Sequence, residues 1–329
     1  MNLLFQKWCL FGTRYKHTVF TFVIEFIFLQ TNTKAHIAVL LTNIFFATNY
    51  SMVKYISPSL VGPYGVNILR VGISLILFWT IWLFGKTTIG IQKKHLPRFL
   101  LCGFTGVAAN QMLFIKGLTM TSTIHASLLM LCTPLLITLF AFWILKEKVT
   151  ILKATGLALG IGGAVLLIIS KEKAGNNTSS LTGDVLIIMN AIFYTIYFML
   201  VKPLMKAYPP LHVIRWVFTF GFVMILPFGW AQFAAIQWSQ FELSHFASLS
   251  FIVIGGTFLA YFFTVYGLQH LGAGITGAYI YTQPIFAAIV ATLVLNEQFT
   301  FQKIISGIMI FTGVFLVSRK VSPVERIET

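Results

Sequence analysis

The second half of this chain repeats the first half at a fixed offset of 150 residues. The residues that recur without a gap are Gly117, Leu118, Pro134, Glu147, Thr150, Lys153 and Gly163, which return as Gly267, Leu268, Pro284, Glu297, Thr300, Lys303 and Gly313. Each of them lies in or beside a long apolar segment. Duplication of a unit of apolar segments is typical of transporters, so the repeat constrains both the fold and the function that we expect.

The composition excludes a soluble protein. Apolar residues make up 57% of the 329 residues and charged residues only 9%, whereas soluble domains carry about 25% charged residues. The surface must therefore face mainly lipid. The three cysteines show no CxxC spacing, and we expect no disulfide framework, no metal site and no cofactor.

Ten apolar runs are long enough for a helix to cross the hydrocarbon core, which needs about 20 residues. They cover residues 36–56, 65–84, 98–117, 124–145, 151–170, 183–202, 212–230, 248–268, 274–295 and 303–318. Very short joints, such as 119–123 and 269–273, make neighbouring helices antiparallel. The sequence therefore predicts an all-α integral membrane protein with ten transmembrane helices.

The basic residues of the loops predict the orientation. With the N-terminus in the cytoplasm, and with Arg70 and Arg215 left out, sixteen Lys and Arg residues fall on the cytoplasmic side and five on the other side. This bias predicts that both termini are cytoplasmic. Five spans in each repeat is an odd number, so the two repeats must insert with opposite orientations. We expect two five-helix inverted-topology repeats in the plasma or inner membrane of the cell.

The spans and the polar stretches between them divide the chain into five parts. These are an N-terminal cytoplasmic tail (1–35), repeat one (36–170), a linker (171–182), repeat two (183–318) and a C-terminal cytoplasmic tail (319–329). The apolar run 19–29 is too short to span. It follows basic residues, as in a signal peptide, but no small-residue cleavage pattern follows it. We interpret it as part of the tail or as an interfacial segment; the alternative is an artefact of start-site choice.

In its spans and repeated positions, the sequence resembles the drug/metabolite transporter superfamily, in its ten-helix form with two EamA-type units. The resemblance covers residues 36–318 and rests on the five-plus-five pattern and on a proline in the fourth helix of each unit. Thirteen residues after Pro134 comes Glu147, and thirteen after Pro284 comes Glu297. The resemblance implies secondary transport of small organic solutes, often export of amino acids or other metabolites, through a central cavity lined by both halves.

The two prolines are expected to kink helices four and nine, because proline cannot donate a backbone hydrogen bond. The carbonyl groups of Met130 and Ile280 then lose their helical partners and need a neighbour, water or cargo in their place. Each kink is either a hinge beside the cavity or a purely structural feature.

Four charged residues in or beside the spans are considered for a role in the mechanism. Glu147 and Glu297 are interpreted as helix caps or loop ion pairs at the water interface and not as coupling sites for a proton. Lys146 and Lys148 flank Glu147, and both acids precede a Thr that starts the next helix. Arg70 could hold a substrate carboxylate, and Arg215 could extend to the cytoplasmic face. An intramembrane cation needs a partner or a route to water.

Polar side chains inside the spans face protein or a cavity, because unpaired polar groups are costly in lipid. The candidates for the substrate cavity are Asn43, Tyr50, Arg70, Asn110, Gln111, Tyr194, Tyr197, Tyr261, Tyr281 and Gln283. Tyr194 and Tyr197 share one face of helix six, and Tyr261 occupies the position that matches Gln111. Many of the polar side chains in the spans are expected only to form hydrogen bonds between helices. His125, at the start of helix four, is either a titrating group or a packed hydrogen-bonding residue.

Together these features predict a secondary active transporter that carries a small organic metabolite, an amino acid or a drug among the options, by alternating access. Its partners are the substrate, the lipid bilayer and a coupling ion, either a proton or sodium. The net charge of +15 is attributed to membrane orientation and not to nucleic acid. A GxxxG pattern at 156–160 indicates internal packing or dimerisation, so the chain is a monomer or a homodimer.

Two other classes are disfavoured. A membrane enzyme needs a convergent catalytic set, but Glu25 and Asp184 lie at the edges of spans and the histidines are dispersed. The other class is a channel or scaffold. A channel should show a repeated ring of pore-lining polar or carbonyl groups, and none is readable in the sequence. Neither an HExxH motif nor a P-loop is present, so direct ATP hydrolysis is not expected.

Overall fold

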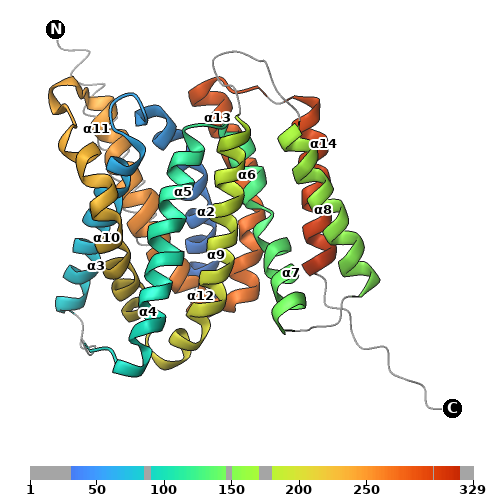
Figure 1. Cartoon of the computed structure of the whole chain (residues 1–329), viewed down its shortest axis with the longest axis horizontal. Coiled ribbons are helices and arrows are strands. Elements are labelled where there is room, and N and C mark those ends of the chain that lie inside the picture. Colours follow the sequence, from blue (N-terminus) through green and yellow to red (C-terminus); the bar gives the residue numbers. More distant parts are fainter. Residues whose placement is uncertain (1–30, 85–89, 146–149, 170–179, 299, 319–329) are drawn as a thin grey trace, which may run out of the picture.

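Ten helices that are long and apolar enough to cross a membrane run through the part of the chain that the computed structural model describes. This part comprises residues 31–84, 90–145, 150–169, 180–298 and 300–318 (Figure 1). The predicted all-α architecture with ten spans is confirmed. Five spans belong to each half. Because five is an odd number, the two repeats run through the bundle in opposite directions.

The first half forms spans one to five. They are α2 (Thr31–Ile56); α3 (Pro63–Phe84); a third span made of η1 (Lys93–His95), α4 (Leu96–Gly103), η2 (Phe104–Ala108) and α5 (Ala109–Leu118); a fourth made of α6 (Thr123–Met130) and α7 (Thr133–Leu145); and α8 (Ile151–Ile169).

The second half forms spans six to ten. They are α9 (Leu181–Ala207); α10 (Pro210–Ala234); an eighth span made of α11 (Leu243–Ser250), η4 (Phe251–Leu259) and most of α12 (Ala260–Ala278), after the short η3 (Trp238–Gln240); a ninth made of the end of α12, η5 (Tyr279–Thr282) and α13 (Gln283–Leu295); and α14 (Phe301–Ser318). Gly272 separates spans eight and nine at a φ of 77°, which glycine adopts readily.

Two helices begin inside segments that the sequence assigns to a tail and to the linker. α2 starts at Thr31, within the predicted N-terminal tail, and α9 starts at Leu181, within the predicted linker. Ser180 explains the second start, because its hydroxyl accepts a hydrogen bond from the backbone N–H of Gly183 at 3.0 Å and caps the helix. The other residues of the predicted tails and linker lie outside the described residues, as do Glu25 and Glu147.

The fourth and ninth spans break beside their prolines. Pro134 is the second residue of α7, after a turn that separates α7 from α6, and Pro284 is the second residue of α13. The Thr133 hydroxyl donates to the Met130 carbonyl at 2.8 Å, and the backbone N–H of Gln283 donates to the Ile280 carbonyl. Neighbouring protein groups therefore satisfy both freed carbonyls, without cargo or water.

The third and eighth spans contain π-helical turns at matching positions, η2 and η4. Each turn holds a glycine against a side chain of another helix. A Cβ on Gly106 would meet the ring of Tyr197, and a Cβ on Gly256, at the matching position, would meet the amide of Asn49. π-Helical turns are frequent at functional sites, and here they lie between the two halves.

The GxxxG pattern of α8 packs inside the bundle. α8 and α14 lie side by side at one edge of the molecule (Figure 1). A Cβ on Gly313 of α14 would lie 2.5 Å from the backbone nitrogen of Gly160 and 2.6 Å from the carbonyl oxygen of Gly156. The glycines thus allow the two helix backbones to touch, which agrees with the internal-packing interpretation.

This contact leads to a stability prediction. Gly313→Ala should destabilise the protein by about 2 kcal/mol, because the new methyl group would overlap backbone atoms that cannot move separately. Gly162→Ala is the matched control, since a Cβ there meets only the end of Met309, at 3.5 Å. Thermal unfolding in detergent should show a lower midpoint for the first variant and no decrease for the second. Equal midpoints would contradict the close packing.

Candidate functional site

The two halves meet along the middle of the bundle. Helix α2 of the first half packs against η4, α12 and α13 of the second half, α5 packs against α9, and α3 packs against both α10 and η4. Most of the polar residues selected from the sequence lie on these helices. We describe first the cluster at the centre of this interface and then a second cluster at one end.

Two residues at matching positions of the repeat bond to each other. The Gln111 side-chain amide donates to the Tyr261 hydroxyl at 3.0 Å. Residues related by a two-fold axis approach each other only close to that axis. This contact therefore marks the position of the pseudo-two-fold axis, and the groups around it lie at the interface between the two halves.

A reciprocal pair of hydrogen bonds joins helices three and six beside this axis. The side chain of Asn190 donates to the Asn110 carbonyl at 2.7 Å, and the side chain of Asn110 donates to the Asn190 carbonyl at 3.3 Å. At the symmetry-related contact between the halves, the Thr42 hydroxyl donates to the carbonyl of Ala260 at 3.3 Å. Ala260 matches Asn110, so the contact between helices one and eight mirrors that between helices three and six.

Arg70 is the charged group of the central cluster. It is only 2% exposed, and its Nε donates to the Thr257 hydroxyl at 3.0 Å. Thr257 in turn donates to the carbonyl of Ile252 at 2.8 Å, across the π-helical turn. Nη1 of Arg70 is buried without a partner among the described residues, and none of the described carboxylates forms an ion pair with it. The guanidinium therefore has an unused donor.

Asn67, one helical turn before Arg70, has an unused acceptor. Its side-chain nitrogen donates to the Gln111 carbonyl at 3.2 Å, while its Oδ1 is buried without a partner among the described residues. Residues three apart on a helix share a face. Helix α3 therefore presents a guanidinium donor and an amide acceptor beside the pseudo-two-fold axis, both without a hydrogen-bond partner among the described residues.

Other predicted residues also lie at the interface. The Gln283 amide donates to Oδ1 of Asn43 at 2.9 Å and joins helices nine and one. Tyr194 and Tyr197 lie on α9 with ring centroids 6.0 Å apart, and Tyr197 covers Gly106. The structure thus brings together side chains from helices one, three, six, eight and nine, together with helix two.

Two predicted tyrosines lie elsewhere. Tyr50 is 4% exposed and packs its ring on Phe114, with centroids 5.1 Å apart, in a hydrophobic part of the core. The hydroxyl of Tyr281 is 2.9 Å from the hydroxyl of Ser318, and its ring contacts Phe311, so this residue joins η5 to α14. The sequence pattern marks both as polar, but their rings serve packing.

Arg215 does not extend to a water interface, so this prediction is wrong. It is 2% exposed, and its guanidinium carbon lies 4.7 Å from the ring centroid of Trp79 and 5.0 Å from that of Trp82. Nη2 is also 3.1 Å from Nδ1 of His212. Stacking on the indole faces compensates the buried cation, which makes a route to water unnecessary.

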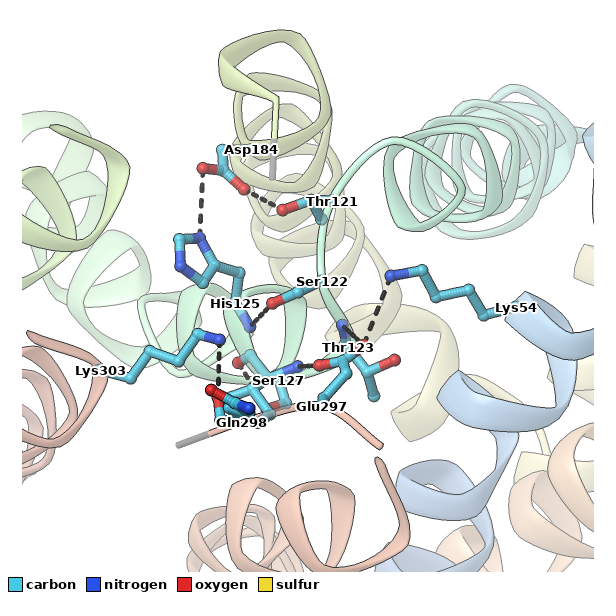
Figure 2. Close-up of polar contacts among 11 residues, drawn as sticks. Lys54, Thr121, Ser122, Thr123, His125, Ser127, Asp184, Glu297, Gln298 and Lys303 are labelled. Carbon is cyan, nitrogen blue, oxygen red and sulfur yellow. Dashed lines mark hydrogen bonds and ion pairs between the residues drawn. The ribbon is translucent and has the colours of Figure 1, made fainter. Parts of the chain in front are cut away.

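The second cluster surrounds the first turn of α6 (Figure 2). We call it the α6 cluster, and its members are Lys54, Thr121, Ser122, Thr123, His125, Asp184, Glu297, Gln298 and Lys303. They come from the end of α2, the start of α6, the start of α9, the end of α13 and the start of α14. Both halves therefore contribute to it.

Glu297 is a helix cap and an ion-pair partner, as predicted, but of a helix in the other half. Its Oε1 accepts from the backbone N–H of Thr123 at 2.8 Å and lies 3.4 Å from Nζ of Lys54, and its Oε2 accepts from the N–H of Ile124 at 3.2 Å. Ser122 accepts the next N–H, that of His125, at 3.1 Å. Glu297 is 3% exposed, whereas the side chain of Lys54 is 15% exposed, so the carboxylate is buried and its ion-pair partner is partly buried.

Asp184 and His125 form a pair that the sequence did not predict. Nδ1 of His125 lies 3.4 Å from Oδ2 of Asp184, and the Thr121 hydroxyl donates to Oδ1 of the same carboxylate. His125 is 0% exposed and Asp184 1% exposed. Asp184 lies in the first turn of α9, at the edge of its span as predicted. The prediction that the histidines are dispersed is wrong for His125, because α6 and α9 begin at the same end of the bundle.

Several polar residues of these clusters were not selected from the sequence. Thr257 lies in an otherwise apolar run, and nothing in that run indicates a partner for Arg70. Asn67 carried a usable signal, an amide one turn from an intramembrane arginine. Asp184 carried another, a single acid at the second position of a predicted apolar helix.

Comparisons with known proteins agree with this architecture. The model of the EamA-like transporter family matches residues 33–169 and again residues 181–319. An uncharacterized transporter of Archaeoglobus fulgidus is 26% identical over 88% of this chain and 99% of its own length. The uncharacterized transporter YetK of Bacillus subtilis is 25% identical over 76% of each chain.

Two further comparisons concern a named exporter and a solved structure. A probable terminal-alkyne amino-acid exporter of Streptantibioticus cattleyicolor is 26% identical over 70% of this chain and 77% of its own length. A crystal structure of a protein aligns with a TM-score of 0.57 at 15% identity, over 86% of this chain and 96% of that one. The latter shows the same fold alone.

Proposed function

Because the chain belongs to the EamA-like transporter family, we propose that it is a secondary active transporter that carries a small amino acid or organic acid by alternating access. The ten spanning helices make it a multi-pass membrane protein, and its relatives are named as transporters. One of them is named as a probable amino-acid exporter. Export is therefore the direction that we favour.

The observation that carries the proposed substrate class is the unused donor of Arg70. A guanidinium binds a carboxylate through two parallel hydrogen bonds, and such a bond is strong in a region shielded from water. Asn67 offers an unused acceptor on the same face of α3, suited to the ammonium group of an amino acid. In our proposal the carboxylate binds Arg70 and the ammonium binds Asn67.

The inverted repeats supply the route across the membrane. Gln111 and Tyr261 meet at the pseudo-two-fold axis, so a substrate held beside them is equidistant from the two ends of the bundle. Rocking of one half against the other would open one end and close the other. We propose that both termini face the cytoplasm and that the α6 cluster closes the opposite end, in the plasma or inner membrane.

Counterflow in proteoliposomes tests this function. Vesicles that contain the purified protein and a high internal concentration of unlabelled amino acids are diluted into a ¹⁴C-labelled amino-acid mixture. A carrier should concentrate the label transiently and saturate, whereas a channel cannot concentrate it and a membrane enzyme would change it chemically. The corresponding amino-acid amides should not compete. Absence of counterflow, or equal competition by amides, would contradict the proposal.

A further inference from the structure

The α6 cluster holds the two buried carboxylates of the part of the chain that the structure describes, Asp184 and Glu297. Both come from the second half, and both bind the first turn of α6 in the first half (Figure 2). Ionisable groups inside a membrane protein are costly and usually functional. The two carboxylates differ in the partners that compensate their charge.

Glu297 is compensated by permanent partners. Two backbone N–H groups at the positive end of α6 and the ammonium group of Lys54 surround its oxygens. The two backbone N–H groups do not titrate, so they hold the carboxylate whatever the pH. Glu297 therefore acts as a fixed link between the halves.

Asp184 is compensated by a partner whose charge can change. Its oxygens bind the neutral hydroxyl of Thr121 and the imidazole of His125. Histidine is the side chain whose charge changes most readily near neutral pH. A carboxylate only accepts hydrogen bonds, so Nδ1 carries the proton in this contact. Nε2 is then the basic nitrogen, and it is buried without a partner among the described residues.

We propose that His125, held by Asp184, binds the coupling proton of the transporter. This inference rests on the proposed function and names its coupling ion. The proton adds to Nε2 and makes an imidazolium, which pairs with the Asp184 carboxylate; release restores the neutral ring. His125 belongs to the first half and Asp184 to the second, so opening this end of the bundle separates them.

Proton binding is thereby linked to the conformation of the bundle. The charged imidazolium attracts Asp184 more strongly than the neutral ring does, so protonation favours the arrangement in which this end is closed. A ligand that favours one of two states shifts their populations. The break between α6 and α7 allows the short α6 to move separately from the rest of the fourth span.

We assign Asp184 as the carboxylate partner of His125 after considering the other charged groups on the elements around α6. Lys54 of α2 is paired with Glu297 after α13, and Lys303 of α14 donates to the Gln298 carbonyl at 3.0 Å. Two more elements pack against α6. In α5 the charged residue is Lys116, in the last turn, and α8 carries only Lys153, in the first turn.

Proton binding can be measured without any substrate. Proteoliposomes on a solid-supported membrane are exposed to a step in pH, with the proton as the only probe, and the transient charge movement is recorded. We expect His125→Gln and Asp184→Asn to reduce this charge at least about tenfold. His270→Gln is the matched control, because His270 is exposed at the end of the eighth span, and it should keep the wild-type charge. Wild-type charge in both cluster variants would overturn the inference.

A second measurement needs no substitution. In the wild-type protein, an imposed pH gradient should drive net accumulation of the labelled amino-acid mixture beyond counterflow. Counterflow without any response to the gradient would overturn proton coupling and leave the proposed function intact. Proton-dependent charge movement without counterflow would instead overturn the proposed function. The two failures are therefore distinguishable.

Discussion

Replacing Arg70 by glutamine is expected to raise the amino-acid concentration for half-maximal counterflow by at least about tenfold. A hydrogen bond to a charged group contributes about 1.5–3 kcal/mol, which corresponds to about 10- to 150-fold in affinity. Glutamine keeps a polar side chain but removes the cation and its two-pronged geometry. Labelled counterflow at graded substrate concentrations gives the shift directly.

Two further variants make this result specific. Arg70→Lys keeps the charge but not the planar fork, so its shift should be smaller than that of Arg70→Gln. Arg98→Gln removes a cation that lies exposed on α4, and it should leave counterflow unchanged. Wild-type half-saturation in Arg70→Gln would contradict the assignment of the carboxylate to Arg70.

Glu297→Ala is expected to destabilise the protein by about 3 kcal/mol, because removal of one member of a buried ion pair costs about 3–5 kcal/mol. The truncation leaves the backbone N–H groups of Thr123 and Ile124 without an acceptor, and it leaves Lys54 without its carboxylate. The midpoint of thermal unfolding in detergent should fall. The loss should be larger than that of any exposed substitution in the same loop.

The adjacent residue gives a control for this experiment. Gln298 is exposed, and its backbone carbonyl is what accepts from Lys303, so Gln298→Ala keeps that bond and should unfold at the wild-type temperature. Equal midpoints for the two variants would contradict the role of Glu297 as the cap of α6.

The architecture could be predicted because the features that determine it, the length of the apolar runs and the number of spans in each repeat, can be read from a single sequence. Ten runs of lipid-compatible length can be counted, and five spans per repeat force opposite insertion. The match of Gln111 with Tyr261 was also readable. Their hydrogen bond was not, because the repeat does not say where the pseudo-two-fold axis passes through the bundle.

Contacts between distant segments could not be predicted in the same way. The pairs of His125 with Asp184 and of Arg215 with Trp79 depend on which ends and faces of helices meet. The π-helical turn at Thr257, across which the Thr257 hydroxyl donates to the Ile252 carbonyl, lies within a run that looks like an ordinary apolar helix. Each of these features arises from packing, which periodicity alone does not encode.

The account depends on two halves that cross the membrane in opposite directions around one binding interface. Lys93 and Leu243 test this most directly, because they are exposed, lie at matching positions 150 residues apart and precede spans three and eight. Each is replaced by cysteine in a chain whose own cysteines are changed to alanine, and a membrane-impermeant maleimide is added to intact cells and to inside-out vesicles. We predict that Lys93→Cys reacts only in the vesicles and Leu243→Cys only in the cells; reaction of both from the same side would contradict the inverted repeat and the carrier that we build on it.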